Sequence, residues 1–65
     1  MLVINLTPTM LTFKDLSDEM FSTMMFIEKL ELKYNDRGYY YIEGTGEELY
    51  KILLKLTYNY DIELI

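Results

Sequence analysis

Apolar and polar residues follow two different periods along the chain, and the first half predicts one strand and one helix. Residues 2–6 are almost all apolar and predict a short strand. Thr7-Pro8-Thr9 ends this strand, because proline has no backbone N–H to donate a hydrogen bond to a neighbouring strand. Apolar residues then recur every three or four positions, which is typical of an amphipathic helix. These residues are Phe13, Leu16, Met20, Met24 and Ile27.

The ends of this predicted helix follow from capping signals. Thr12 is one candidate N-cap, with Asp15 in the first turn, where the helix dipole favours an acidic residue. Ser17, followed by two acidic residues, is a second candidate start. The apolar stripe predicts that the helix ends near Lys29.

The second half of the chain predicts a hairpin, a helix and a last strand. Residues 30–35 alternate with a period of two, and residues 39–43 are rich in tyrosine, so both segments predict strands. Residues 35–38 predict a turn with Gly38 in the left-handed conformation. Thr45 and Glu48 form a capping box that starts a helix, and residues 61–65 alternate again as a short strand. The apolar stripe of that helix is Leu49, Ile52, Leu53, Leu56 and Tyr60.

The resulting order, β-α-β-β-α-β, predicts an α+β, ferredoxin-like fold. Such a fold has a four-stranded antiparallel sheet in the order 4-1-3-2 and two helices on one face. The length of 65 residues predicts a single domain, residues 1–65.

Further apolar residues on one flank of each helix predict that the two helices meet through these flanks. They are Phe21 and Met25 on the first helix and Tyr50 and Leu54 on the second.

Composition argues against catalysis and against a resident cofactor or metal ion. The chain has no histidine and no cysteine, and therefore lacks the commonest general base and the commonest metal ligands. Gly44-Thr45-Gly46 precedes a helix as a phosphate loop does, but Glu47 and Glu48 would repel a phosphate. We expect no enzyme activity.

The absence of cysteine and of a signal-peptide or membrane-span pattern predicts a cytoplasmic protein.

Net charge narrows the expected partners. Eleven acidic and six basic residues give a formal charge of −5, which repels nucleic acid and anionic membranes. The same charge favours a protein partner with a basic surface. A second copy of the chain is a further candidate, because 65 residues limit the size of the core.

The tyrosines provide the candidate binding site. Pairing the predicted hairpin around its turn places Tyr34 with Tyr40 on one side, which is expected to pack under the helices. The other side, left open by a ferredoxin-like fold, receives Tyr39 and Tyr41, and large rigid tyrosines are common in interfaces. The predicted partner-binding residues are Tyr39, Tyr41, Glu43, Glu31, Lys33 and Glu63.

One short segment, Arg37-Gly38-Tyr39-Tyr40-Tyr41-Ile42, resembles the third-strand signature of the RNA-recognition motif family. The resemblance implies that Tyr39 and Tyr41 stack on bases. It covers about eight residues. Tyr40 stands where the family has glycine or alanine, Gly44 stands where it has an aromatic residue, and residues 2–6 lack the aromatic of the other signature.

These observations favour a small acidic binding protein. The expected role is an inhibitor or antagonist of a larger basic or nucleic-acid-handling protein, of the kind that phages use against host or defence proteins; its location would then be the host cytoplasm. This expectation rests on analogy of size and charge. The alternatives are an RNA- or single-strand-binding module that uses the third-strand tyrosines, and a structural protein that only self-associates.

Overall fold

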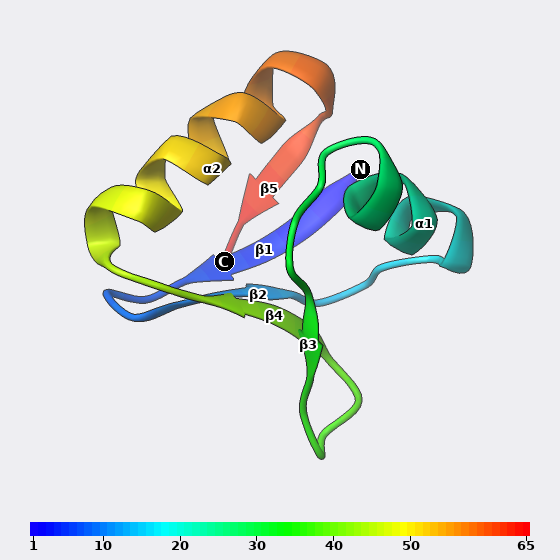
Figure 1. Cartoon of the computed structure of the whole chain (residues 1–65), viewed down its shortest axis with the longest axis horizontal. Coiled ribbons are helices and arrows are strands. Elements are labelled where there is room, and N and C mark those ends of the chain that lie inside the picture. The colour runs from blue at the N-terminus through cyan, green and yellow to red at the C-terminus, as the bar shows by residue number, and fades with distance from the viewer.

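The computed structural model describes residues 1–65 and contains five strands and two helices (Figure 1). The five strands form one mixed sheet in the order β3-β4-β2-β1-β5, and both helices lie over the same face. The α+β class is therefore confirmed. In chain order the elements are β1 (Leu2–Leu6), β2 (Met10–Phe13), α1 (Asp18–Phe26), β3 (Lys33–Tyr34), β4 (Tyr40–Glu43), α2 (Gly46–Asn59) and β5 (Ile62–Leu64).

The strand β2 is the main difference from the sequence prediction, which placed the start of a helix at Phe13. Leu11 and Phe13 are buried and alternate with the half-buried Thr12, as in a strand that is covered on one face. A tight turn joins β1 to β2, because the Thr7 hydroxyl accepts a hydrogen bond from the Met10 amide at 3.1 Å. Pairing with β1 and β4 on its two sides overrides the helical spacing of the apolar residues.

The extra strand changes the sheet topology. The four predicted strands keep their predicted spatial order, but β2 is inserted between β1 and β4. The four-stranded antiparallel ferredoxin-like sheet is therefore wrong. The chain crosses from β4 through α2 to β5 over two strands instead of one, so β5 runs parallel to β1, with Leu2 opposite Ile62.

The helix α1 starts at the second candidate cap and is shorter than predicted. The Ser17 side chain accepts a hydrogen bond from the Met20 amide at 3.2 Å, which caps the helix. The helix ends at Phe26, and Lys29 adopts the left-handed conformation with φ 56°. The chain then turns away from the helix direction before the predicted end is reached.

The hairpin, the helix α2 and the position of the last strand along the chain agree with the prediction, although this strand pairs parallel with β1 and not antiparallel. Gly38 has φ 89°, and Tyr34 lies opposite Tyr40 in the predicted register. The capping box is present, since the Thr45 side chain accepts from the Glu48 amide at 3.2 Å and the Glu48 side chain reaches back to Thr45. The strand β3 is shorter than predicted, however, and includes only Lys33 and Tyr34.

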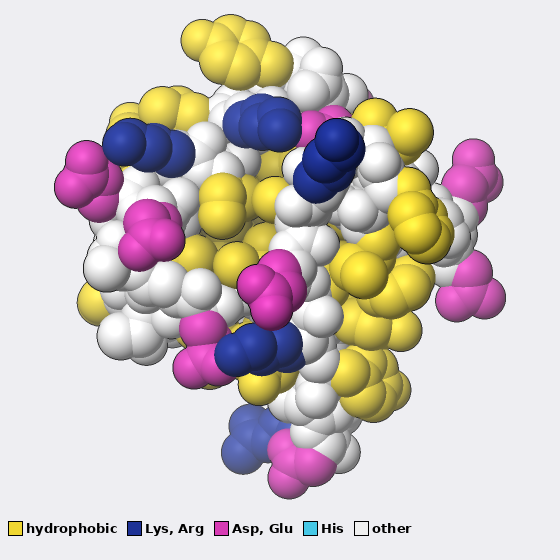
Figure 2. Space-filling model, in the orientation of Figure 1, with side chains coloured by type: hydrophobic (Ala, Val, Ile, Leu, Met, Phe, Trp, Pro, Cys, Tyr) yellow, Lys and Arg dark blue, Asp and Glu magenta, His cyan; other side chains and the backbone are white.

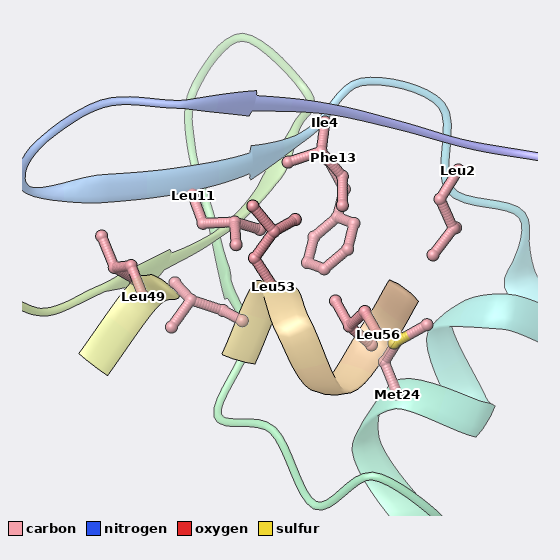
Figure 3. Close-up of a cluster of buried hydrophobic side chains, with 9 residues drawn as sticks. Leu2, Ile4, Leu11, Phe13, Met24, Leu49, Leu53 and Leu56 are labelled. Carbon is pink, nitrogen blue, oxygen red and sulfur yellow. The ribbon is translucent and has the colours of Figure 1, made fainter. Parts of the chain in front are cut away.

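The core lies between the sheet and the helices, as Figure 3 shows. Side chains of β1 and β2 point toward those of α2 and toward Met24 of α1. The buried apolar residues are Leu2, Ile4, Leu11, Phe13, Met24, Ile42, Leu49, Leu53 and Leu56. No helix has the length and apolar character that a membrane span requires.

The two helices do not meet through the predicted flanks. Phe21 packs on Tyr40 of β4, with 4.5 Å between ring centroids, while Tyr50 and Leu54 are exposed. The two helices cover different parts of the sheet (Figure 1), and Phe21 accordingly contacts a strand while Tyr50 and Leu54 face solvent.

Candidate functional site

The candidate site is on the sheet face opposite the helices, which no element of the chain covers (Figure 1). Strand alternation and register decide which side chains lie there. Thr12 of β2 lies opposite Tyr41 of β4, which in turn lies opposite Lys33 of β3. The other face carries the buried partners Leu11 and Ile42.

Tyr39 and Tyr41 share this open face, as predicted, and both are half-buried. The Lys14 ammonium lies 4.5 Å from the centroid of the Tyr39 ring, which is a cation–π contact. Tyr41 lies between Thr12 on one side and Lys33 on the other. Tyr41 is thus held within the sheet, whereas Tyr39, which directly precedes β4, contacts Lys14, which directly follows β2.

Lys33 and Glu43 form an ion pair beside the tyrosines. The Lys33 Nζ donates a hydrogen bond to the Glu43 Oε1 at 3.0 Å. This hydrogen bond, together with the charge of Glu43, raises the pKa of Lys33 above its usual value. The charge of Glu43 is therefore offset within the chain, which weakens its predicted role in attracting a basic partner.

Glu31 is exposed and lies outside the β3–β4 pairing, although the prediction extended this strand over residues 30–35 and so placed Glu31 opposite Glu43. The strand β3 begins only at Lys33, because the preceding segment rises from the sheet toward α1 (Figure 1). Glu31, Lys33 and Glu43 instead border a shallow hollow of about 260 Å³ between this segment, β4 and the start of α2. Figure 2 shows its apolar floor between charged side chains.

Glu63 lies far from the tyrosines on the same face. It is on the edge strand β5 opposite Val3, three strand spacings from β4, or about 14 Å. The structure therefore groups Tyr39 and Tyr41 on the open face, places Lys33, Glu43 and Glu31 at the edge next to them, and leaves Glu63 apart.

Tyr34 and Tyr40 lie on the helix side, as predicted, but Tyr34 is 62% exposed. Tyr40 contacts Phe21 on one side and Tyr34 on the other, the latter with ring centroids 4.9 Å apart. Figure 2 shows a strip of apolar side chains on the side of β3 that faces α1. A second aromatic surface thus exists, and its outer member is largely open to solvent.

The sequence reasoning missed Lys14, because it placed residues 12–15 at the start of a helix. Alternation of Leu11, Thr12 and Phe13 after a threonine-proline turn is the signal that could have revealed the strand and hence the position of Lys14.

A buried polar cluster was also missed. The Glu28 side chain is 8% exposed, accepts a hydrogen bond from the Tyr60 hydroxyl at 3.1 Å and lies 3.5 Å from the Lys55 Nζ. Burial, followed by the hydrogen bond and the charge of Glu28, raises the pKa of Tyr60 above its usual value. The buried Glu28 carboxylate therefore has both a hydrogen-bond donor and a cationic partner, and the cluster links the end of α1 to the end of α2.

No group of three or more histidine, cysteine, aspartate or glutamate side chains is arranged to hold a metal ion. Comparison of the chain with protein-family models, with characterised proteins and with solved structures found no match.

Proposed function

We propose that this chain is a binding protein that holds a protein partner on the open face of its sheet, with Tyr39 and Tyr41 as the central contacts. The observation that carries the proposal is the pair of half-buried tyrosines on an uncovered face, with the Lys14 ammonium over the Tyr39 ring and Tyr41 in register between Thr12 and Lys33. Side chains that are already ordered lose little entropy on binding.

Chemistry supports a protein partner. Tyrosine combines a large apolar area with a hydroxyl group and is enriched at the centres of interfaces. The net charge of −5 favours a partner with a basic surface. Of the predicted acidic residues that form no ion pair, Glu63 lies on the open face and Glu31 at its edge. A small binding chain of this kind suits an inhibitor or antagonist of a larger protein, and that role is part of the proposal.

The test is affinity capture with four versions of the chain, followed by binding measurements on each captured protein. Tyr39→Ala and Tyr41→Ala should weaken the complex by about tenfold or more, with little change in melting temperature. Tyr58→Ala is the matched control, because Tyr58 is 88% exposed on α2 and lies away from the open face. Equal affinity of all four versions would contradict the proposal.

RNA is the competing ligand, and the same variants test it. Fluorescence anisotropy with single-stranded RNA oligonucleotides should show weak binding at low salt that is insensitive to Tyr39→Ala. Tight binding that falls steeply with salt and is lost in this variant would replace the protein partner with a nucleic acid.

A further inference from the structure

We propose that a cavity at the junction of α1 and α2 binds an alkylguanidinium or alkylammonium group, as an arginine side chain or a polyamine presents it. The cavity has a volume of about 470 Å³ and lies between the segment that enters α1, the end of α2 and the start of β1. This volume is within the range of sites that hold small organic groups. It lies on the helix side of the sheet, so the proposal does not rest on the open face.

The base of the cavity is apolar and its rim is polar. Leu2 is buried, and Met20 and Tyr60 are half-buried, so these three residues form the base. A methylene chain that contacts them leaves water, which is favourable. The exposed residues form the rim; they are Asp15, Ser17, Asn59 and Asp61, with Met1 beside them.

The rim offers hydrogen-bond acceptors in the Asp15 and Asp61 carboxylates and the Asn59 amide, against the Ser17 hydroxyl as side-chain donor and the amino terminus at Met1. Neither Asp15 nor Asp61 takes part in an ion pair. The Asn59 amide nitrogen donates to the Lys55 carbonyl at 3.4 Å, which leaves the Asn59 carbonyl oxygen as an acceptor. The Tyr60 hydroxyl already donates to Glu28 and is not available to the cavity.

The end of α2 adds to the negative potential. Its last turn contains no basic residue, so the partial negative charge of the final carbonyl groups is not offset. A guest with several N–H donors, a positive charge and an apolar stem satisfies both the rim and the base. An anion, or a neutral group that only accepts hydrogen bonds, does not match the rim, whatever its stem.

The test is an NMR titration of the whole labelled chain with butylguanidinium and with butylurea, which has the same stem but no charge. Butylguanidinium should give saturable shifts at Ser17 and at residues 59–61, and butylurea should bind at least about tenfold more weakly. Equal binding of the two probes, or shifts spread over all acidic residues, would overturn the proposal.

Matched double variants separate a site from general attraction between charges. Asp15→Asn/Asp61→Asn should weaken butylguanidinium binding at least about fivefold. Asp36→Asn/Glu47→Gln removes the same charge from exposed positions outside the cavity and should change the affinity less than twofold. Equal loss in the two double variants would show that only net charge matters and would overturn the proposal.

Two further probes identify the source of the cation. A Gly-Arg-Gly peptide with blocked ends represents a side chain of a protein, and spermidine represents a free polyamine. The proposal allows either probe to bind more tightly at the cavity. The probe that binds more tightly indicates whether the natural cation is an arginine side chain of a protein or a free polyamine. Failure of both to displace butylguanidinium would overturn the proposal.

Discussion

A hydrogen bond between two residues that are far apart in the sequence, Glu28 and Tyr60, links the end of α1 to the end of α2. Glu28 follows the end of α1 and Tyr60 follows the end of α2, 32 positions later, yet their side chains form a hydrogen bond. A buried carboxylate is costly unless it has partners, and Tyr60 and Lys55 supply them. Because Lys55 is largely exposed, Tyr60 is the partner that shares the buried side of this cluster.

Tyr60→Phe should therefore lower the free energy of unfolding by about 1–2 kcal/mol, since it leaves a nearly buried carboxylate without its hydroxyl donor. Urea denaturation followed by circular dichroism measures the change. Tyr58→Phe is the control, because it removes a hydroxyl from a side chain that makes no hydrogen bond within the chain, and it should have almost no effect. Equal stability of the two variants would contradict the role of the cluster.

The same residue predicts a loss of stability at alkaline pH. Since the pKa of Tyr60 is raised on folding, the folded chain keeps this proton when the unfolded chain has lost it. The contribution is fully present below about pH 10 and falls as the pH rises through the folded-state pKa. Denaturation between pH 8 and 11 should show a steeper fall for the wild type than for Tyr60→Phe. The raised pKa of Lys33 acts in the same direction in both chains and cancels in the comparison.

Elements with strong local signals could be predicted from the sequence. The β3–β4 turn needs a residue with positive φ, and Gly38 supplies it. The start of α2 has a capping box, and its buried residues repeat with helical spacing. These signals depend only on neighbours in the chain, which is why the hairpin register and α2 are confirmed.

The strand β2 could not be predicted in the same way, because Phe13 fits two patterns. It continues the helical stripe toward Leu16, and it also alternates with Leu11. Only pairing with β1 and β4, which depends on residues far along the chain, decides between them. The topology, the position of Lys14 and the parallel pairing of β5 all follow from this one strand.

The part of the candidate site that depends only on the hairpin could be predicted from the sequence. Tyr39 and Tyr41 share a face because of strand alternation alone. Glu31 and Glu63 were grouped with them on the assumption of a longer β3 and a four-stranded sheet. The extra strand increases the distance to Glu63, and the short β3 removes Glu31 from the ladder. Whether these residues bind a partner remains a prediction.

The helix α2 gives a direct test of which face it buries. Leu53 is 7% exposed in the core, while its neighbour Leu54 is 42% exposed. Leu53→Ala should lower the free energy of unfolding by about 2–5 kcal/mol, and Leu54→Ala by less than about 1 kcal/mol. Leu32→Ala should lie between them, because Leu32 is half-buried and outside β3. Denaturant midpoints of the three variants measure this order, and a larger effect of Leu54→Ala would show that the helix is rotated.

The whole molecule combines a small core with two unprotected sheet edges. The strands β3 and β5 each have a neighbour on one side only, so their outer backbone groups are free. At the β5 edge, Leu64 of the strand itself and Ile65 directly after it expose apolar side chains to solvent. Opposing this, each copy carries a formal charge of −5, which repels a second copy at low salt.

We expect weak self-association through the β5 edge, because pairing of two such edges would satisfy free backbone groups and cover apolar side chains. Sedimentation equilibrium from about 10 µM to 1 mM should show a monomer–dimer equilibrium that shifts toward dimer as salt screens the repulsion between copies. Leu64→Lys should shift the equilibrium toward monomer, because a lysine on an edge strand opposes edge-to-edge pairing. Leu54→Lys changes the net charge by the same amount on α2, so an edge-specific interaction should respond to it less. A chain that is monomeric at every concentration and salt tested would contradict self-association, whereas equal responses of the two variants would place the contact away from β5.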